Sequence, residues 1–155
     1  MITDFHHFSI SSSDADRSIE FYRDVFGMEL VSDREVPAGG FVEEVTGVAG
    51  ANVRIVHLRG YGFNFELLEY KAPRGDRRAR EPNHAGSAHL CFVAEDLDAE
   101  FERLKTHGVR FRSPRPVTVV GGPNDGGKAL YLEDPDGNAV EVLQLVRAWP
   151  TGARE

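Results

Sequence analysis

The amino-acid sequence predicts an α+β fold in which two βαβββ repeats form a cleft lined by curved mixed β-sheets, with helices outside. The first observation is a near-repeat: an apolar strand that leads into an acidic helix start occurs at residues 7–16 and again at residues 89–98. The second is that each half carries a glutamate inside a later apolar strand, at Glu66 and Glu141. The third is that one half alone would leave a face of its sheet uncovered, whereas 155 residues suffice for one ordinary globular domain.

Composition excludes several classes of protein. Hydrophobic residues make up 41% of the chain and charged residues 28%, as in soluble globular proteins. The net charge of −7 argues against a nucleic-acid partner. A single cysteine, Cys91, excludes an internal disulfide and a cysteine-rich zinc site. The sequence has no apolar run of membrane-spanning length and no signal peptide pattern, so we expect a cytoplasmic protein without a membrane partner.

The first repeat, residues 1–72, begins with an alternating segment that predicts a strand over residues 5–11. Ser13 and Asp14 are favourable helix caps, apolar residues at helical spacing predict a helix over residues 18–26, and Gly27 ends it. Further strands are predicted at residues 28–36, 53–58 and 63–70.

Residues 73–87 are rich in Pro, Gly and Arg without an apolar period, which indicates a linker. The second repeat, residues 88–148, again predicts a strand followed by a helix that ends at Gly108, and then further strands. We predict residues 149–155 to be a loose tail. The expected elements are a strand at 89–93, a helix at 97–107, and strands at 109–112, 117–120, 129–133 and 139–146.

Four potential metal ligands fall at equivalent places in the two repeats: His7, Glu66, His89 and Glu141. Strand alternation places each histidine on the face away from its apolar neighbours. A carboxylate within an apolar strand is costly unless a charge pairs with it, and a divalent cation would pair both glutamates. Two imidazoles and two carboxylates suit Zn, Ni, Co, Mn or Fe, among which the ligand types do not choose. Glu69 has the opposite parity to Glu66, so we expect it to face outward.

Other polar residues are weaker candidates for a site. His57 lies in a strand and His84 in the linker, where either could line a site, but neither has a partner in the other repeat. Cys91 shares the parity of His89, although a buried small hydrophobic residue is the simpler interpretation. Four arginines of the linker could hold an anionic substrate or could simply be solvated; they are Arg74, Arg77, Arg78 and Arg80.

These motifs resemble the vicinal oxygen chelate superfamily, which includes glyoxalase I, methylmalonyl-coenzyme A epimerase, extradiol dioxygenases, and fosfomycin and bleomycin resistance proteins. The resemblance covers about residues 5–146 and implies paired βαβββ units around a metal-bearing cleft. Glyoxalase I-like members use a His and a Glu from each half, and the four residues named above match that set. Gly40-Phe41-Val42-Glu43 is similar to an epimerase segment that carries a catalytic glutamate. The most specific segments are residues 6–10, 18–27 and 86–90, and Asp134-Pro135-Asp136-Gly137 leading to Glu141.

Three functions are compatible with this set, all with a small-molecule substrate or ligand. The first is a metal-dependent isomerase or lyase that abstracts a proton next to a metal-bound carbonyl, with Glu141 and Glu66 as candidate bases. The second is an Fe(II) or Mn(II) dioxygenase that uses His7, His89 and Glu141 and leaves Glu66 without a role. The third is a binding or resistance protein without catalysis. The resemblance and the expected sheet edges also predict a homodimer.

Overall fold

The computed structural model describes residues 1–76 and 81–148. The chain divides into two compact units, Met1–Arg78 and Ala79–Glu155. Part of the predicted linker, residues 77–80, and the predicted tail, residues 149–155, lie outside the described residues. Within the part of the chain that is described, no helix has the length and apolar character needed to cross a membrane.

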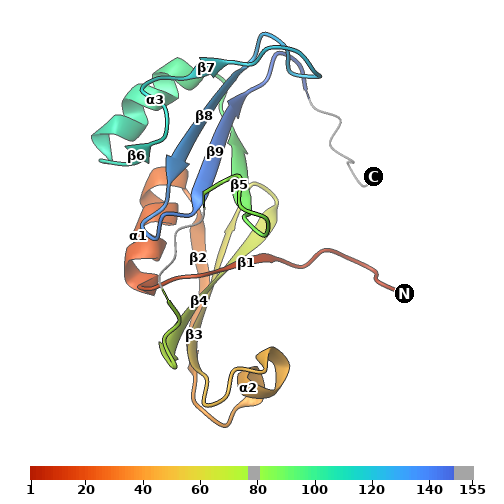
Figure 1. Ribbon diagram of the computed structural model, residues 1–155, viewed down its shortest axis with the longest axis vertical. Coiled ribbons are helices and arrows are strands. Elements are labelled where there is room, and N and C mark those ends of the chain that lie inside the picture. Colours follow the sequence, from red (N-terminus) through yellow and green to blue (C-terminus); the bar gives the residue numbers. More distant parts are fainter. Residues whose placement is uncertain (77–80, 149–155) are drawn as a thin grey trace. The chain divides into compact units, whose positions relative to one another are not determined.

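The first unit is a four-stranded mixed sheet covered on one face by a helix (Figure 1). Its sheet order is β1-β4-β3-β2; β1 runs parallel to β4 and the other neighbours are antiparallel. The side chain of Asp14 accepts a hydrogen bond from the Arg17 N–H and caps α1, while Gly27 ends the helix in the left-handed conformation. The elements are β1 (Phe8–Ser11), α1 (Ala15–Phe26), β2 (Glu29–Val36), α2 (Phe41–Thr46), β3 (Asn52–Gly60) and β4 (Phe63–Ala72).

The second unit repeats this plan, with the order β5-β9-β8-β6 and with β7 also paired to β8. As in the first unit, the strand before the helix is parallel to the last strand, here β5 to β9. The predicted α+β class with two mixed sheets is therefore confirmed. The elements are β5 (His89–Val93), α3 (Leu97–Thr106), β6 (Arg110–Phe111), β7 (Val117–Thr118), β8 (Lys128–Glu133) and β9 (Ala139–Gln144).

The helix-covered face of the first sheet holds a dense apolar core. Tyr22 of α1 packs edge-on against Phe65 of β4, with ring centroids 4.7 Å apart, and both residues are buried. Leu58 and Leu67, from the two central strands, are fully buried beside them. Because strand side chains alternate, Glu66 lies on the opposite face of β4 from these residues.

Two elements differ from the expectation. The first strand begins at Phe8 rather than at residue 5. In the described part of the chain it pairs with β4, and the pairing of β4 with β3 starts just after the turn at Tyr61 and Gly62, so β4 offers no partner for residue 5. The short helix α2 was not predicted, because six residues are too few to establish a helical period. Its buried residue Val42 packs on the uncovered face of the first sheet, in a cluster with Val36, Ala51, Val53 and Ile55.

The expectation that Glu69 faces outward is wrong. Its parity is opposite to that of Glu66, as predicted, but α1 covers that face, so Glu69 is only 4% exposed. Its carboxylate accepts hydrogen bonds from the Lys71 ammonium group at 2.8 Å and from the backbone N–H of Ala15, at the start of α1, at 3.3 Å. The carboxylate thus fixes the helix N-terminus to the sheet, where a negative charge is favoured.

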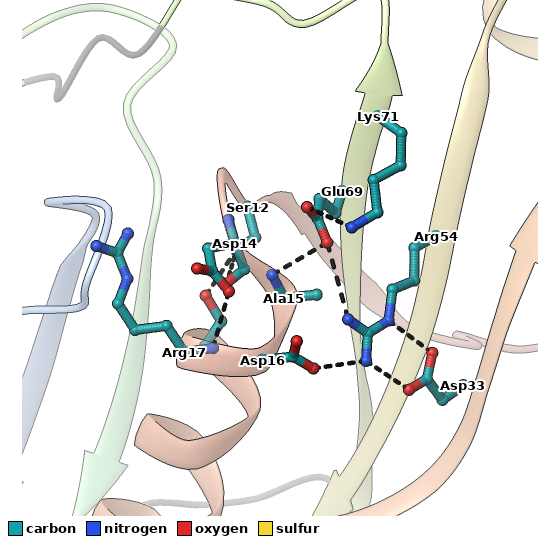
Figure 2. Close-up of polar contacts among 10 residues, drawn as sticks. Ser12, Asp14, Ala15, Asp16, Arg17, Asp33, Arg54, Glu69 and Lys71 are labelled. Atoms are coloured by element: carbon teal, nitrogen blue, oxygen red, sulfur yellow. Dashed lines mark hydrogen bonds and ion pairs between the residues drawn. The ribbon is translucent and has the colours of Figure 1, made fainter.

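An arginine on the neighbouring strand joins this contact to a wider network (Figure 2). Arg54 donates two hydrogen bonds to Asp33, at 2.9 and 2.7 Å, and one to Asp16 at 2.8 Å, while its guanidinium lies 3.9 Å from the Glu69 carboxylate. These bonds from Arg54 hold the pKa values of Asp33 and Asp16 below their usual range. The network connects β2, β3 and β4 to the first turn of α1.

Candidate functional site

The first half brings His7 and Glu66 together on the face of the sheet away from α1. His7 directly precedes β1, and Ser9, two residues later, is the register partner of Glu66 on β4. The Nε2 atom of His7 lies 3.3 Å from Oε1 of Glu66. Nδ1 of the same ring lies 2.7 Å from Nδ1 of His6, so one of the two rings donates this hydrogen bond. The Glu66 side chain is only 13% exposed, and His7 is more open.

A second imidazole reaches the same carboxylate from β3. His57 is the direct register partner of Glu66, and its Nε2 atom lies 3.1 Å from Oε2 of Glu66. On the far side of its ring, Nδ1 lies 2.9 Å from the hydroxyl of Ser32 on β2. Each oxygen of Glu66 therefore contacts a different histidine.

The second half brings His89 and Glu141 together in the same way. His89 is the first residue of β5, and Cys91, two residues later, is the register partner of Glu141 on β9. The Nε2 atom of His89 lies 3.2 Å from Oε2 of Glu141. The hydroxyl of Tyr131 on β8 lies 3.3 Å from the same nitrogen, and Tyr131 is the register partner of Glu141.

Tyr131 is thus the structural counterpart of His57, which corrects the expectation that His57 has no repeat partner. Each residue lies directly opposite its glutamate on the adjacent antiparallel strand. The relation is hidden in the sequence because the residue types differ and because the turns between the paired strands differ. Counting outward from each turn to the residue opposite each glutamate would have revealed it.

The surroundings of Glu141 keep its neutral neighbours protonated. Burial of the thiol and then the negative charge of Glu141 raise the pKa of Cys91 to about 12. Burial and, after it, the same carboxylate raise the pKa of Tyr131. Both side chains remain neutral donors near pH 7, so neither is a ready nucleophile. Cys91 retains exposed surface and is not the buried small hydrophobic residue that the sequence favoured.

The geometry of each pair fits one edge of a metal coordination sphere. Ligands about 2.0–2.2 Å from an ion are separated by about 3.0 Å in octahedral geometry and about 3.4 Å in tetrahedral geometry. The two N–O separations, 3.3 and 3.2 Å, fall in this interval. Among residues 1–76 and 81–148, no three His, Cys, Asp or Glu side chains form a ready group of metal ligands. Ser9 adds a buried hydroxyl oxygen with no hydrogen-bond partner in the described part, next to Glu66 in register.

The other predicted candidates make local contacts, are exposed, or lie outside the described residues. The Glu43 carboxylate accepts a hydrogen bond from the Gly39 N–H at 3.2 Å, a contact at the start of its own helix. Arg74 is exposed, and His84 lies in a turn with its backbone N–H bonded to the Glu81 carbonyl. The remaining linker arginines, Arg77, Arg78 and Arg80, lie outside the described residues.

Comparisons with known proteins agree with this architecture. The family model of the Glyoxalase/Bleomycin resistance protein/Dioxygenase superfamily matches residues 4–142, and the chain belongs to that superfamily. The resemblance expected from the sequence is therefore confirmed. A glyoxalase family protein from Bacillus cereus has the same fold, with a TM-score of 0.78 at 21% identity over 95% of this chain and 97% of that one.

Two relatives are named enzymes. A 2-epi-5-epi-valiolone epimerase from Actinomyces sp is 34% identical in an alignment of 154 positions, gaps included, that covers 96% of this chain and 80% of the epimerase. A lactoylglutathione lyase from Pseudomonas aeruginosa is 28% identical in an alignment of 157 positions, gaps included, that covers 90% of this chain and 81% of the lyase. Both an isomerase and a lyase therefore occur among the relatives of this chain.

Proposed function

We propose that the chain is a metal-dependent isomerase or lyase that moves a proton at a carbon next to a carbonyl group of a small molecule. The observation that carries this proposal is the pair of His–Glu contacts, His7–Glu66 and His89–Glu141, at equivalent register positions in the two halves. A structural role would not require the same two residue types in the same contact twice. The names of the epimerase and lyase relatives support the same reaction class.

His7, Glu66, His89 and Glu141 would hold the ion, which is Zn, Ni, Co, Mn or Fe by ligand type. When bound, such an ion polarises a carbonyl oxygen and makes a neighbouring C–H bond more acidic. Ligation requires a lone pair on His7 Nε2, and the ring then donates its Nδ1 proton to Nδ1 of His6. That hydrogen bond would keep the ring in the ligating tautomer.

Glu141 and Glu66 are the candidates to move the proton. Both carboxylates are largely buried, so water competes little for a proton that they take up. One carboxylate can remove the proton and return it to a neighbouring carbon, whereas an epimerisation requires that a second acid, such as the other carboxyl group in its protonated form, donate a proton to the opposite face of the same carbon. The hydroxyl of Tyr131, a neutral donor 3.3 Å from Nε2 of His89, would hold the His89 ring in position.

The burial of Glu66 between two histidines favours the four-ligand interpretation over a dioxygenase. A site of His7, His89 and Glu141 alone would leave Glu66 as a buried carboxylate that contacts His7 and His57 without taking part. We also propose that the chain forms a homodimer, since both of its sheets are open. Sedimentation at micromolar concentration tests the dimer, which a strictly monomeric protein would contradict.

Proton exchange tests the reaction class without knowledge of the substrate. The purified protein, loaded in turn with Zn²⁺, Ni²⁺, Co²⁺, Mn²⁺ and Fe²⁺, is incubated in D₂O with a panel of cyclic and acyclic hydroxyketones and with methylglyoxal plus glutathione. We expect deuterium at a carbon next to the carbonyl with at least one metal, and loss of that signal in Glu141→Gln. Absence of exchange with every metal and substrate, in a protein that also binds no metal, would favour a binding protein instead.

A further inference from the structure

A row of three polar side chains crosses the first sheet on the face that carries Glu66. Ser32 on β2, His57 on β3 and Glu66 on β4 are successive register partners on three adjacent strands. The contacts along the row are 2.9 Å from Ser32 Oγ to His57 Nδ1 and 3.1 Å from His57 Nε2 to Glu66 Oε2. At the equivalent place in the second half Tyr131, and not a histidine, stands opposite Glu141.

The backbone of β2 is adapted to this row. The register of β2 against β3 shifts between Leu30 and Ser32, so that one extra residue, Val31, is accommodated there. Without this bulge Val31 would stand opposite His57, and the ring would meet an apolar side chain. Bulges commonly redirect a side chain next to a functional site. Here the bulge places a hydroxyl where His57 Nδ1 can bond to it.

Hydrogen-bond chemistry determines which atoms of the row donate and which accept. An ionised carboxylate only accepts hydrogen bonds, so His57 Nε2 carries the proton that it shares with Glu66. In a neutral ring Nδ1 then accepts, and the hydroxyl of Ser32 donates to it. Oε2 of Glu66 is thereby held by His57, while Oε1 remains directed toward His7 Nε2, 3.3 Å away.

We propose that His57, held by Ser32, is a positioning residue that fixes the carboxylate of Glu66 so that Oε1 and His7 Nε2 present one ready edge to a divalent ion. The proposal rests on the proposed function, because it assigns a purpose to His57 in the same site. Outer-sphere partners of this kind commonly change metal affinity 10–100-fold when removed. In the second half Tyr131, and not an imidazole, stands opposite Glu141.

Metal affinity and metal spectroscopy test the role directly. Co²⁺ is titrated into the metal-free protein against a chromophoric chelator, and the visible spectrum of the bound Co²⁺ is recorded as a report on ligand number and geometry. We expect His57→Ala to bind Co²⁺ about 10–100-fold more weakly with an altered spectrum. His57→Gln, whose amide N–H can still donate to Glu66, should recover most of the affinity, and Ser32→Ala should lose less than His57→Ala.

Two controls separate this role from general effects. His84→Ala removes an exposed histidine outside the proposed ligand set and should leave affinity and spectrum unchanged. Thermal unfolding of the metal-free variants shows whether any of them is damaged in folding. If His57→Ala folds poorly, Ser32→Ala and His57→Gln still decide the matter, because both preserve the volume of the row.

The outcomes distinguish failure of this inference from failure of the function. Wild-type affinity and spectrum in His57→Ala, with Glu66→Gln strongly impaired, would overturn the positioning role and leave the metal site standing. A wild-type protein that binds neither Co²⁺ nor Zn²⁺ would overturn both. A parallel loss of stability and affinity in His57→Ala that His57→Gln does not repair would show that the residue acts only in the fold, which also contradicts the proposal.

Discussion

Replacing Arg54 by methionine is expected to lower the free energy of unfolding by about 2–3 kcal/mol at pH 7. Methionine keeps an apolar stem in the position of the arginine and removes only the guanidinium. That group is the centre of the network in Figure 2, where it contacts Asp33, Asp16 and Glu69. Its loss therefore affects one buried and two more exposed carboxylates at once.

The magnitude follows from how far water screens each partner. The two hydrogen bonds to Asp33 contribute about 1 kcal/mol together, because the Asp33 side chain is one-third exposed. The Glu69 side chain is 6% exposed and loses one of its two cations, which costs about 1–2 kcal/mol. Removing the sole partner of a buried charge costs more, about 3–5 kcal/mol. Lys71 and the Ala15 N–H continue to satisfy it. Solvent screens the interaction of Arg54 with Asp16, which is largely exposed, so this contact adds little to the free energy of unfolding.

The effect should also depend on pH with a definite sign. Arg54 lowers the folded-state pKa values of Asp33 and Asp16 below 3.8, so their stabilisation is complete above about pH 5 and is lost as the pH falls through the lowered values. The difference between the wild type and Arg54→Met should therefore shrink on acidification.

Urea unfolding followed by circular dichroism and fluorescence, at several pH values, measures this difference. Arg59→Met is the matched control on the same strand, since Arg59 is exposed and bonds to the neutral amide of Asn64; its change should stay within about 0.5 kcal/mol. A change below about 0.5 kcal/mol for Arg54→Met at pH 7, or a difference in stability that grows toward acid pH, would contradict this prediction.

Further predictions concern a helix end, a turn and the proposed chemistry. Gly27→Ala should destabilise the protein by about 1 kcal/mol in urea unfolding, because position 27 has a φ of 66°. Asp134→Ala should cost about 2 kcal/mol by the same measurement, since this 5% exposed residue accepts bonds from the N–H groups of Asp136 and Asn138 and from the Asn138 amide. Glu141→Gln should lower proton-exchange activity about 100-fold or more with unchanged circular dichroism; near wild-type exchange would exclude it as the base. Dialysis against a chelator should abolish exchange, and re-addition of one divalent metal should restore it.

Local patterns predicted most of the elements in the right order. Asp14 and Gly27 mark the ends of α1 by capping chemistry that acts within a few residues, and strand alternation predicted that His7 lies on the face away from its apolar neighbours. The prediction for Glu69 was wrong although its parity was right. Parity tells which residues share a face, but only tertiary packing decides that α1 covers the face of Glu69.

The row of Ser32, His57 and Glu66 could not be predicted from the sequence, for a different reason. Its formation depends on the register between strands, and that register depends on a bulge at Val31 and on the length of each turn. Comparing the two halves of the sequence at a constant spacing finds positions with the same residue type. It misses equivalent positions whose residue types differ, as those of His57 and Tyr131 do. Such positions are identified only when each strand is counted outward from its own turn.

The difference between His57 and Tyr131, which stand opposite the two glutamates, bears on how the two halves could divide the proposed proton transfer. Two identical halves would present two equivalent carboxylates, whereas two carboxylates held differently can take different roles, one that stays in place and one that exchanges a proton with the substrate. In this chain Glu66 contacts two imidazoles, and Glu141 contacts one imidazole beside a phenol and a thiol whose pKa values are raised. Under the proposed function, the more firmly held carboxylate is Glu66, and Glu141 is the one that can leave its contact to take up a proton. Under this proposal, the difference between His57 and Tyr131 opposite the two glutamates gives the two copies of one structural unit different chemical roles.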